Sequence, residues 1–306
     1  MVMMRGATPK QLVPGLMGII GQAYKDVAPE HSVLFETLNS SRNFEEEVMM
    51  SGFGLAAAKA EGANIQYDSQ EELWTARYTH ETVGLGFSIT EEAIEDNLYE
   101  NYSKKAAKGL GRSLAETKQI KAAAVINNGF SSTYKGGDGV QLFGTHPIKA
   151  GSISNTVSVD ASESAFENAV IALAKWTDDR GLLINVKPVS LHIPVELQFD
   201  VERILKSTLR PTVVTNGTTG VTNTNEVNAL NNMGYFNNVN VHRRFTDTDA
   251  WFIKTDVTDG LKHFVRRSPR VETDGDFQTG NSMIKMTERY SFGWSDWRQM
   301  YGSQGA

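Results

Sequence analysis

Histidines, neighbouring glutamates and paired aspartates are the residues of this chain whose types could support catalysis or metal binding. Its six histidines lack the spacing of metal ligands and are spread along the chain, at His31, His80, His146, His192, His242 and His263. The pairs Asp247-x-Asp249 and Asp274-Gly275-Asp276 lack the rest of a calcium loop, so we interpret both as turns. Glu45-Glu46-Glu47 could form a carboxylate cluster, but consecutive acids are more often a solvated face or the partner of a basic patch.

Motifs of the common nucleotide-binding and hydrolytic sites are absent from the sequence. There is no G-x-x-x-x-G-K-[ST], no complete G-x-G-x-x-G, no G-x-S-x-G and no H-E-x-x-H. An enzyme would have to assemble its site from dispersed residues such as His146, Asp138 and Glu288. We favour for His146 the simpler role of a loop histidine fixed by its own backbone. The sequence therefore predicts no catalytic residue, no cofactor and no metal site.

Composition narrows the classes of partner. The chain has 306 residues, a net charge of −6 and no cysteine, which excludes a disulfide framework and a thiolate zinc site. Its acidity argues against general affinity for nucleic acid. One basic run could still meet nucleic acid or form ion pairs with another protein surface, and it comprises Lys262, Arg266, Arg267 and Arg270. No apolar run is long enough to cross a bilayer, and we expect no signal peptide and no membrane partner.

The element that organises these residues is a long helix predicted over Ile89–Asn128. Thr90 followed by two glutamates is typical of a helix N-terminus. Apolar residues then recur at helical spacing while lysines and arginines occupy the other face. Gly109 and Gly111 either bend this spine helix or break it.

Residues 44–88 are predicted to form a long two-stranded ribbon. Apolar residues alternate with polar ones from Trp74 to Tyr78 and from Val83 to Ile89, as in strands. The parity changes between the two runs, which indicates a bulge or a change of neighbouring strand. The tip, 52–62, is rich in Gly and Ala. Because a ribbon has little core of its own, it should lie on something else, such as a neighbouring copy.

The remaining elements give an α+β chain. We expect an extended or mobile arm over 1–13, helices over 14–27 and near 33–38, and a glycine-rich loop over 129–154. A helix from Asp160 to Gly181, a strand over 182–193 and a helix from Pro194 to Pro211 follow. The Thr/Asn/Gly tract 212–225 is predicted to be an exposed loop. Further strands are expected over 239–242, 250–255, 261–267 and 284–292, before an aromatic C-terminus.

Two segments resemble those of a known family. The run 138–147, Asp-Gly-Val-Gln-Leu-Phe-Gly-Thr-His-Pro, resembles the loop after the spine helix in major capsid proteins of tailed bacteriophages, including the Mu-like group. The run 288–302, from Glu288 through Tyr290, Trp294 and Arg298 to Gly302, resembles the C-terminal segment of those proteins. The order of elements is also similar to the HK97-like capsid fold.

The resemblance implies a shell protein and a division of the chain. Residues 1–43 would be the N-terminal arm, 44–88 the extended hairpin (E-loop), 89–155 with 256–306 the peripheral domain, and 156–255 the axial domain. Copies would assemble as hexamers and pentamers into the icosahedral head that encloses the phage genome. It further implies a separate scaffolding protein, a portal, a cement protein, weak non-specific contact with packaged double-stranded DNA, and assembly in the bacterial cytoplasm before residence in the virion.

Intersubunit contacts are expected on the ribbon and on the basic run. The candidates are Glu45, Glu46, Glu47, Phe53, Lys59, Trp74, Arg266, Arg267 and Arg270. Some capsids crosslink a ribbon lysine to an asparagine, but nothing near Lys59 marks the assisting acid, so we do not expect this here. Two alternatives stay open: an encapsulin-like nanocompartment with the same fold, and a soluble enzyme built from dispersed residues.

Overall fold

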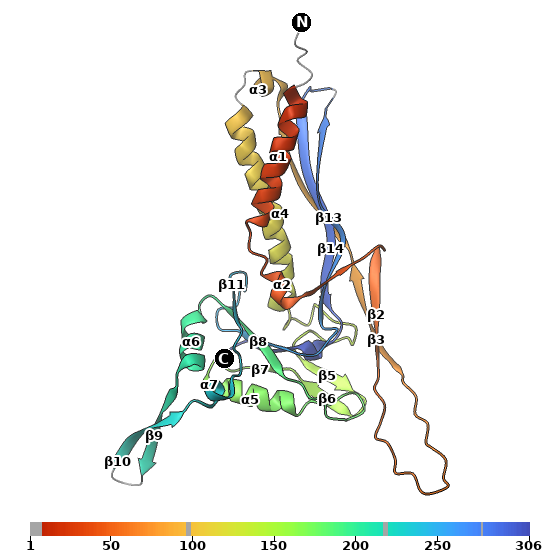
Figure 1. Ribbon diagram of the computed structural model, residues 1–306, viewed down its shortest axis with the longest axis vertical. Coiled ribbons are helices and arrows are strands. Elements are labelled where there is room, and N and C mark those ends of the chain that lie inside the picture. Colours follow the sequence, from red (N-terminus) through yellow and green to blue (C-terminus); the bar gives the residue numbers. More distant parts are fainter. Residues whose placement is uncertain (1–7, 96–98, 217–219, 277) are drawn as a thin grey trace. The chain divides into compact units, whose positions relative to one another are not determined.

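The computed structural model describes residues 8–95, 99–216, 220–276 and 278–306. Helices and strands are mixed along the chain, and Figure 1 shows their order. Contacts divide the described chain into two compact units. The first contains residues up to 45 together with 78–123 and 262–293, and the second contains 46–77, 124–261 and 294–306.

Helices cover one sheet in the first unit. The sheet has the order β1-β13-β14-β4, formed by Glu36–Asn39, Leu261–Gly275, Ser282–Trp294 and Glu81–Ile89. β1 runs parallel to β13, and β4 runs antiparallel to β14. The helices are α1 (Thr8–Lys25), α2 (His31–Leu34), α3 (Glu91–Glu95) and α4 (Tyr99–Asn127). Their shared core comprises Leu16, Ile20, Ile89, Ala107, Leu110, Leu114, Ile284 and Met286.

The predicted spine helix is confirmed in its main part and wrong at its start. α4 has 29 residues and runs without a break through both glycines. Ile89 instead ends β4, and α3 begins after Thr90, whose Oγ1 accepts the backbone N–H of Ala93 at 3.4 Å. Position 111 requires glycine for a steric reason, because a Cβ there would lie 2.4 Å from the carbonyl oxygen of Ile20 in α1. A Cβ at Gly109 would meet nothing within 4 Å.

The predicted ribbon is shorter in the structure. β2 (Phe44–Met50) pairs with β3 (Glu72–Thr79) in a two-stranded sheet, and residues 51–71 form an open loop beyond them (Figure 1). We call residues 51–71 the tip loop. β4 leaves the ribbon and pairs with β14, so the parity change is a change of neighbouring strand. The alternation over 81–89 correctly indicated a strand but did not reveal its partner.

The second unit is built on a five-stranded sheet. Its order is β11-β8-β12-β15-β7, formed by Val239–His242, Pro188–Pro194, Trp251–Thr255, Met300–Ser303 and Thr156–Val157. The helices are α5 (Glu163–Ala174), α6 (Gln198–Lys206) and α7 (Ala229–Met233), with a short 3₁₀ helix over Trp297–Gln299. Two hairpins complete the unit: β5 (Thr145–Ile148) with β6 (Gly151–Ser154), and β9 (Leu209–Asn216) with β10 (Gly220–Val227).

Several predicted boundaries are wrong in this unit. The helix expected up to Gly181 ends at Ala174, and its N-cap is Ser162, whose side chain accepts the N–H of Ala165. Pro194 closes β8 instead of opening a helix. The strand expected over 182–193 begins only at Pro188, opposite a register shift in β12. That position fits a residue with no backbone N–H to donate.

Three other segments have more regular structure than predicted. Residues 8–13, expected in the arm, belong to α1. The expected loop over 129–154 contains the β5–β6 hairpin. The tract 212–225 was expected to be a loop, but outside 217–219 it pairs as β9 and β10. Threonine has high β propensity, and backbone pairing needs no apolar period.

A buried histidine pair lies in the five-stranded sheet. His192 Nδ1 on β8 is 2.8 Å from His242 Nε2 on β11, and Ser190 Oγ is 2.8 Å from His192 Nε2. Burial lowers the pKa of His192 well below 6.5 and that of His242 to about 4. The nearby charges of Lys254 and Arg244 act in the same direction. Both imidazoles are therefore neutral in the folded chain near neutral pH.

We predict that this pair makes the folded chain sensitive to acid. A histidine with a depressed folded-state pKa contributes stability that is fully present above its unfolded value of 6.5 and is lost as pH falls toward the folded value. For His242 the loss between pH 6.5 and 4 amounts to roughly 3 kcal/mol. Urea unfolding over this range, compared between wild type and His242→Gln, should show a flatter pH profile for the variant. Parallel profiles would contradict the prediction.

The two glycines of α4 should respond oppositely to alanine. Gly109→Ala should stabilise the chain by about 1 kcal/mol, because alanine is the better helix former and its methyl group meets open space. Gly111→Ala should destabilise it by about 1–3 kcal/mol, because the methyl group would collide with the α1 backbone. Urea unfolding midpoints of the two variants measure the difference, and a shift of the same sign would refute the packing argument.

Candidate functional site

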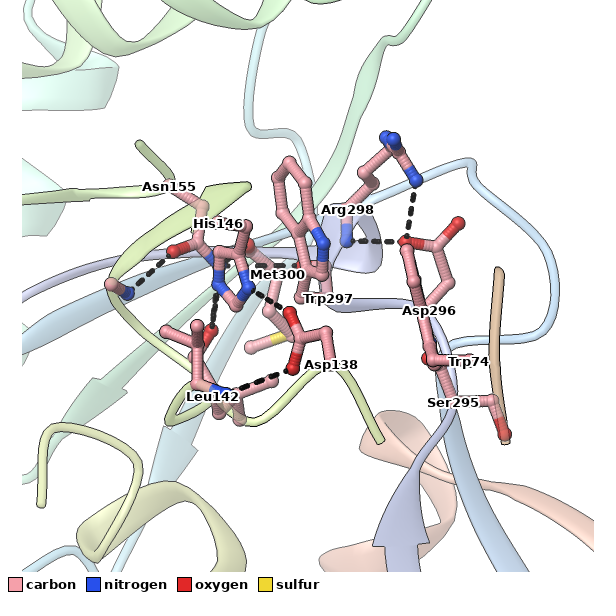
Figure 2. A network of polar contacts seen from close by, with 12 residues as sticks. Trp74, Asp138, Leu142, His146, Asn155, Ser295, Asp296, Trp297, Arg298 and Met300 are labelled. Carbon is pink, nitrogen blue, oxygen red and sulfur yellow. Dashed lines mark hydrogen bonds and ion pairs between the residues drawn. The ribbon is translucent and has the colours of Figure 1, made fainter. Parts of the chain in front are cut away.

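The Asp138–Pro147 loop is held by a buried histidine and an aspartate (Figure 2). His146 Nδ1 lies 2.5 Å from Asp138 Oδ2, and its Nε2 lies 3.3 Å from the carbonyl oxygen of Leu142. Asp138 Oδ1 also accepts the backbone N–H of Val140 at 3.1 Å, which closes the turn at Gly139. Gly139 has a φ of +79°, a conformation that glycine adopts at low cost.

The same histidine joins the loop to the C-terminal segment. Its ring stacks on Trp297 with a centroid distance of 4.2 Å and an interplanar angle of 7°. His146 is fully buried, Trp297 is 1% exposed, and Trp176 packs edge-on against Trp297. A histidine with both ring nitrogens engaged and no exposed surface has no route to a substrate. The geometry is that of a structural histidine, as the sequence favoured, with Asp138 as an additional partner.

Asn155 connects the loop, β7 and the C-terminal segment. Its Oδ1 accepts the N–H of Gly144 at 2.9 Å, while its Nδ2 donates to the carbonyls of Leu142 at 2.7 Å and Met300 at 3.0 Å. The side chain is completely buried. One amide therefore satisfies backbone groups from two segments that are far apart in sequence (Figure 2).

Three buried charges lie beside this junction. Arg298 donates to Asp179 at 3.1 Å and to Asp296 at 3.4 Å, and its guanidinium lies over the Trp297 ring. Asp296 also accepts the N–H of Arg298 as the N-cap of the 3₁₀ helix. Burial raises the pKa of the Asp296 carboxyl, and the charge of Arg298 opposes that shift. These contacts hold the 3₁₀ helix of the C-terminal segment against the turn that contains Asp179.

The base of the β2–β3 ribbon is attached to that segment. Trp74 Nε1 donates to the carbonyl of Ser295 at 3.0 Å, and Ser295 Oγ donates to Glu47 at 2.5 Å. Gly137 permits close approach, because a Cβ there would lie 2.7 Å from both the Trp74 ring and the Thr75 carbonyl. The C-terminal segment, which carries part of the family resemblance, therefore holds the base of the ribbon, and Gly137 packs against it.

Polar contacts hold the two ends of the tip loop together. Ser51 N–H donates to the carbonyl of Glu71, and the N–H of Glu71 donates to Ser51 Oγ, both at 2.8 Å. Asp68 accepts the N–H of Gly54 at 2.8 Å, which lowers the pKa of its carboxyl. Lys149 binds Glu71 at 2.8 Å, and this hydrogen bond lowers the pKa of that carboxyl too.

The tip loop itself exposes large apolar side chains. The exposed fractions are 55% for Phe53, 87% for Leu55, 65% for Ile65 and 92% for Tyr67. Four such residues within one short loop are more than the scattered exposed apolar residues of an ordinary surface. The structure thus presents an apolar loop on a firmly attached base.

The predicted contact residues fall into two groups. Several contact their own chain: Glu45 accepts from Ser40, Glu46 pairs with Arg77, Glu47 and Trp74 bind at Ser295, Arg267 donates to Thr287, and Arg270 pairs with Glu272. Phe53 and Lys59 are exposed on the tip loop, and Arg266 is half-buried. Their role between subunits stays a prediction.

The dispersed residues considered for an enzyme site form structural contacts within their own chain. Glu288 lies fully buried in the first unit, where it accepts from Tyr24 at 2.9 Å and pairs with Lys118 at 3.4 Å. Burial raises the pKa of its carboxyl. Across the described residues, no three His, Asp or Glu side chains gather as a metal site would require. In the same part of the chain, no helix is long and apolar enough to cross a membrane.

Sequence reasoning missed Asn155, Asp179 and Ser295. Asn155 stands between Ser154 and Thr156 and looks like an ordinary loop residue. Asp179 lies in a turn, and its partner Arg298 is more than a hundred residues away along the chain. The only usable signal was the resemblance of the two segments, because it could have suggested that they meet.

With this geometry in view, comparisons with known proteins identify the family. A family model described as phage capsid protein matches residues 72–303, about three quarters of the chain. The chain belongs to the phage capsid protein family. It is a major capsid protein, a subunit of the icosahedral shell of the virion. A search of the curated proteins found no significant match.

Solved structures confirm the HK97-like fold. A virus-like particle from Pyrococcus furiosus matches with a TM-score of 0.55 and 9% identity, over 95% of this chain and 98% of that one. The capsid of cyanophage P-SCSP1u matches with a TM-score of 0.55 and 10% identity, over 89% of this chain and 86% of that one. An encapsulin complex from Synechococcus elongatus matches with a TM-score of 0.51 and 9% identity, over 91% of this chain and 88% of that one. At these identities the likeness concerns the fold alone, and membership of the Mu-like group stays a prediction.

We predict that the Asn155 amide is required for stability of the second unit. Asn155→Ala leaves the buried N–H of Gly144 without its side-chain acceptor and removes a donor from the carbonyls of Leu142 and Met300, and a buried group without a partner costs about 1–3 kcal/mol. Asn155→Asp keeps the acceptor for Gly144 but loses the donor, so it should also destabilise. Urea unfolding of unassembled subunits should show a loss of about 3 kcal/mol for Asn155→Ala. Asn185→Ala, an exposed control in the same unit, should change little. Equal midpoints for the two alanine variants would contradict this role.

Proposed function

We propose that the subunit closes the shell by clamping a neighbouring copy with its tip loop. The observation that carries this is the tip loop itself, which exposes four large apolar side chains on a base fixed by Trp74 and Ser295. A two-stranded ribbon is marginal in water by itself. Burial of its apolar side chains against another copy would stabilise both the loop and the assembly, because identical copies under closed symmetry each supply the same contact.

A groove in the first unit is the surface that we propose receives the loop. It has a volume of about 820 Å³ and is lined by strands β4, β13 and β14. Phe87, Val271 and Ile284 are among its apolar lining residues, and Arg270 and Lys285 are among its charged ones. Apolar side chains of a neighbour's tip loop would be buried against the apolar lining. Arg270 is one of the contact residues predicted from the sequence, and its place in this groove supports that proposal.

Assembly through hexamers and pentamers, in the host cytoplasm, is part of the same proposal. The division into arm (1–43), E-loop (44–88), peripheral domain (89–155 with 256–306) and axial domain (156–255) is also proposed. We further propose that the role is structural, without catalysis. A scaffolding protein, a portal and a cement protein stay predictions. Contact with packaged DNA should be weak, because the chain carries a net charge of −6.

An encapsulin-like compartment is the second candidate. The similarity to an encapsulin complex favours it, since one fold serves both kinds of shell. The family match favours the phage shell. Shells purified from the native source separate the two: a shell that encloses DNA supports the phage reading, and a shell filled with protein cargo supports the compartment.

We predict that the tip loop is needed for closure and not for folding. Deletion of residues 52–62, or the double variant Leu55→Ser and Tyr67→Ser, should leave a folded subunit that fails to form closed shells. The control Ile171→Ser with Leu183→Ser removes two apolar side chains that are also exposed, at 52% and 73%, and should assemble normally. Negative-stain images score shells of uniform diameter, while circular dichroism checks folding.

Closed shells at wild-type yield from either tip-loop variant would exclude the clamp. Failure of the control as well would show that loss of exposed apolar surface anywhere prevents assembly. Phe87→Asp, placed in the proposed receiving groove, should reproduce the defect of the tip loop. Normal assembly of that variant would show that the tip loop binds a surface other than this groove.

A further inference from the structure

One exposed face of the spine helix α4 carries a row of cations. Lys104, Lys108 and Arg112 follow at intervals of four residues, and Lys105 lies beside them. At about 100° per residue these four side chains share an arc of about 100°, and they extend over about 12 Å of the helix. All four are exposed, on the helix marked α4 in Figure 1. We call this row the basic stripe.

Three cations of the basic stripe differ from several other basic residues of the chain. Those others lie beside carboxylates, as in Lys149–Glu71 and Lys206–Glu202. Within the described residues, no carboxylate forms an ion pair with Lys105, Lys108 or Arg112. Like charges three or four residues apart destabilise a helix. An arrangement that is unfavourable in the isolated subunit becomes favourable when an anion covers it.

Gly109 gives an independent indication. It is exposed, lies at the edge of the stripe one turn after Lys105, and has no neighbour within 4 Å of a Cβ position, so none of the described residues requires a glycine there. Gly111, two residues on, is required by the α1 backbone. A glycine within a helix is costly but lets another molecule approach the backbone closely. At Gly109 none of the described residues is close enough to need that space, so we assign it to an external molecule.

We propose that the basic stripe contacts the phosphate backbone of packaged duplex DNA. The proposal rests on the function of the chain as a shell subunit that encloses a DNA genome. Duplex DNA carries one charge per about 1.7 Å of its axis, so a 12 Å row of cations faces several phosphates. The stripe contains no apolar side chain, whereas surfaces that bind proteins have an apolar core depleted of charge. A row of phosphates therefore fits it better than an acidic protein.

Contacts of this kind are weak and independent of base sequence. Each neutralised phosphate contributes about −0.9 to the slope of log K against log salt, so three cations contribute about −2.7. A few contacts for each subunit would hold the outer layer of DNA in place across the shell without preventing its release. This agrees with an acidic chain in which the cluster of cations on α4 is local.

The test compares charge-matched variants of the unassembled subunit. The stripe variant is Lys105→Gln, Lys108→Gln and Arg112→Gln, and its control is Lys135→Gln, Lys175→Gln and Lys187→Gln, which removes three exposed charges elsewhere. Anisotropy of a short fluorescein-labelled duplex is measured over a series of salt concentrations. We expect the stripe variant to lose about 2.7 from the slope and at least tenfold in affinity at low salt. The control should keep the wild-type slope.

Gly109→Leu separates close approach from charge. It keeps every cation and adds bulk with a good helix former, so it should weaken DNA binding with little change in slope. Wild-type affinity in this variant would remove the role proposed for Gly109 and overturn close approach at this face.

Images of shells keep this proposal distinct from the proposed function. Closed shells from the stripe variant, together with a flattened slope, support the DNA contact. An unchanged slope overturns it and leaves shell assembly untouched. Loss of shells with unchanged DNA binding would assign the stripe to a protein surface and overturn the proposal as well.

Discussion

The side-chain amide of Asn155 is the contact on which the second unit depends most. The segments that meet there, a loop after the spine helix and the end of the chain, have backbone groups that no sheet satisfies. A buried carbonyl or N–H without a partner costs about 1–3 kcal/mol, so several of them together would exclude this arrangement. One amide satisfies three such groups at 2.7–3.0 Å. The stacked pair of His146 and Trp297 then has a fixed place, and the base of the ribbon is held through Ser295.

The base of the β2–β3 ribbon contributes to the stability of the single subunit, whereas the exposed tip loop keeps apolar surface that assembly could bury. The base is satisfied within one chain, whereas the apolar side chains of the tip loop find no cover there. Full burial of one such side chain stabilises by about 1.5–3 kcal/mol, and under the proposed clamp every subunit of a closed shell would repeat the contact. A loop that packed on its own chain would have no such contribution left for a neighbour. The exposed apolar surface of the tip loop is what the proposed clamp requires of an unassembled subunit.

Sequence periodicity predicted the elements that bury one face and little of their pairing. The apolar spacing gave α4 and the strand over Val239–His242. The alternation over 81–89 indicated a strand, but its pairing with β14 depends on residues two hundred positions away. The tract 212–225 has no apolar period because its pairing, outside 217–219, is a matter of backbone hydrogen bonds. Asn155 could not be found at all, since its role exists only where two distant segments meet.

Gly109 and Gly111 show why one residue type in one helix cannot be interpreted from the sequence. Both suggested a bend or a break, and α4 runs straight through both in its hydrogen bonding. Gly111 is required by packing within the subunit, because the carbonyl of Ile20 leaves no room for a methyl group. Gly109 faces open space, and nothing among the described residues accounts for a glycine there. One face of the spine helix packs on the core of its own subunit, and we assign the other face to an external partner. A thin shell favours this arrangement, because each of its subunits is exposed on more than one surface.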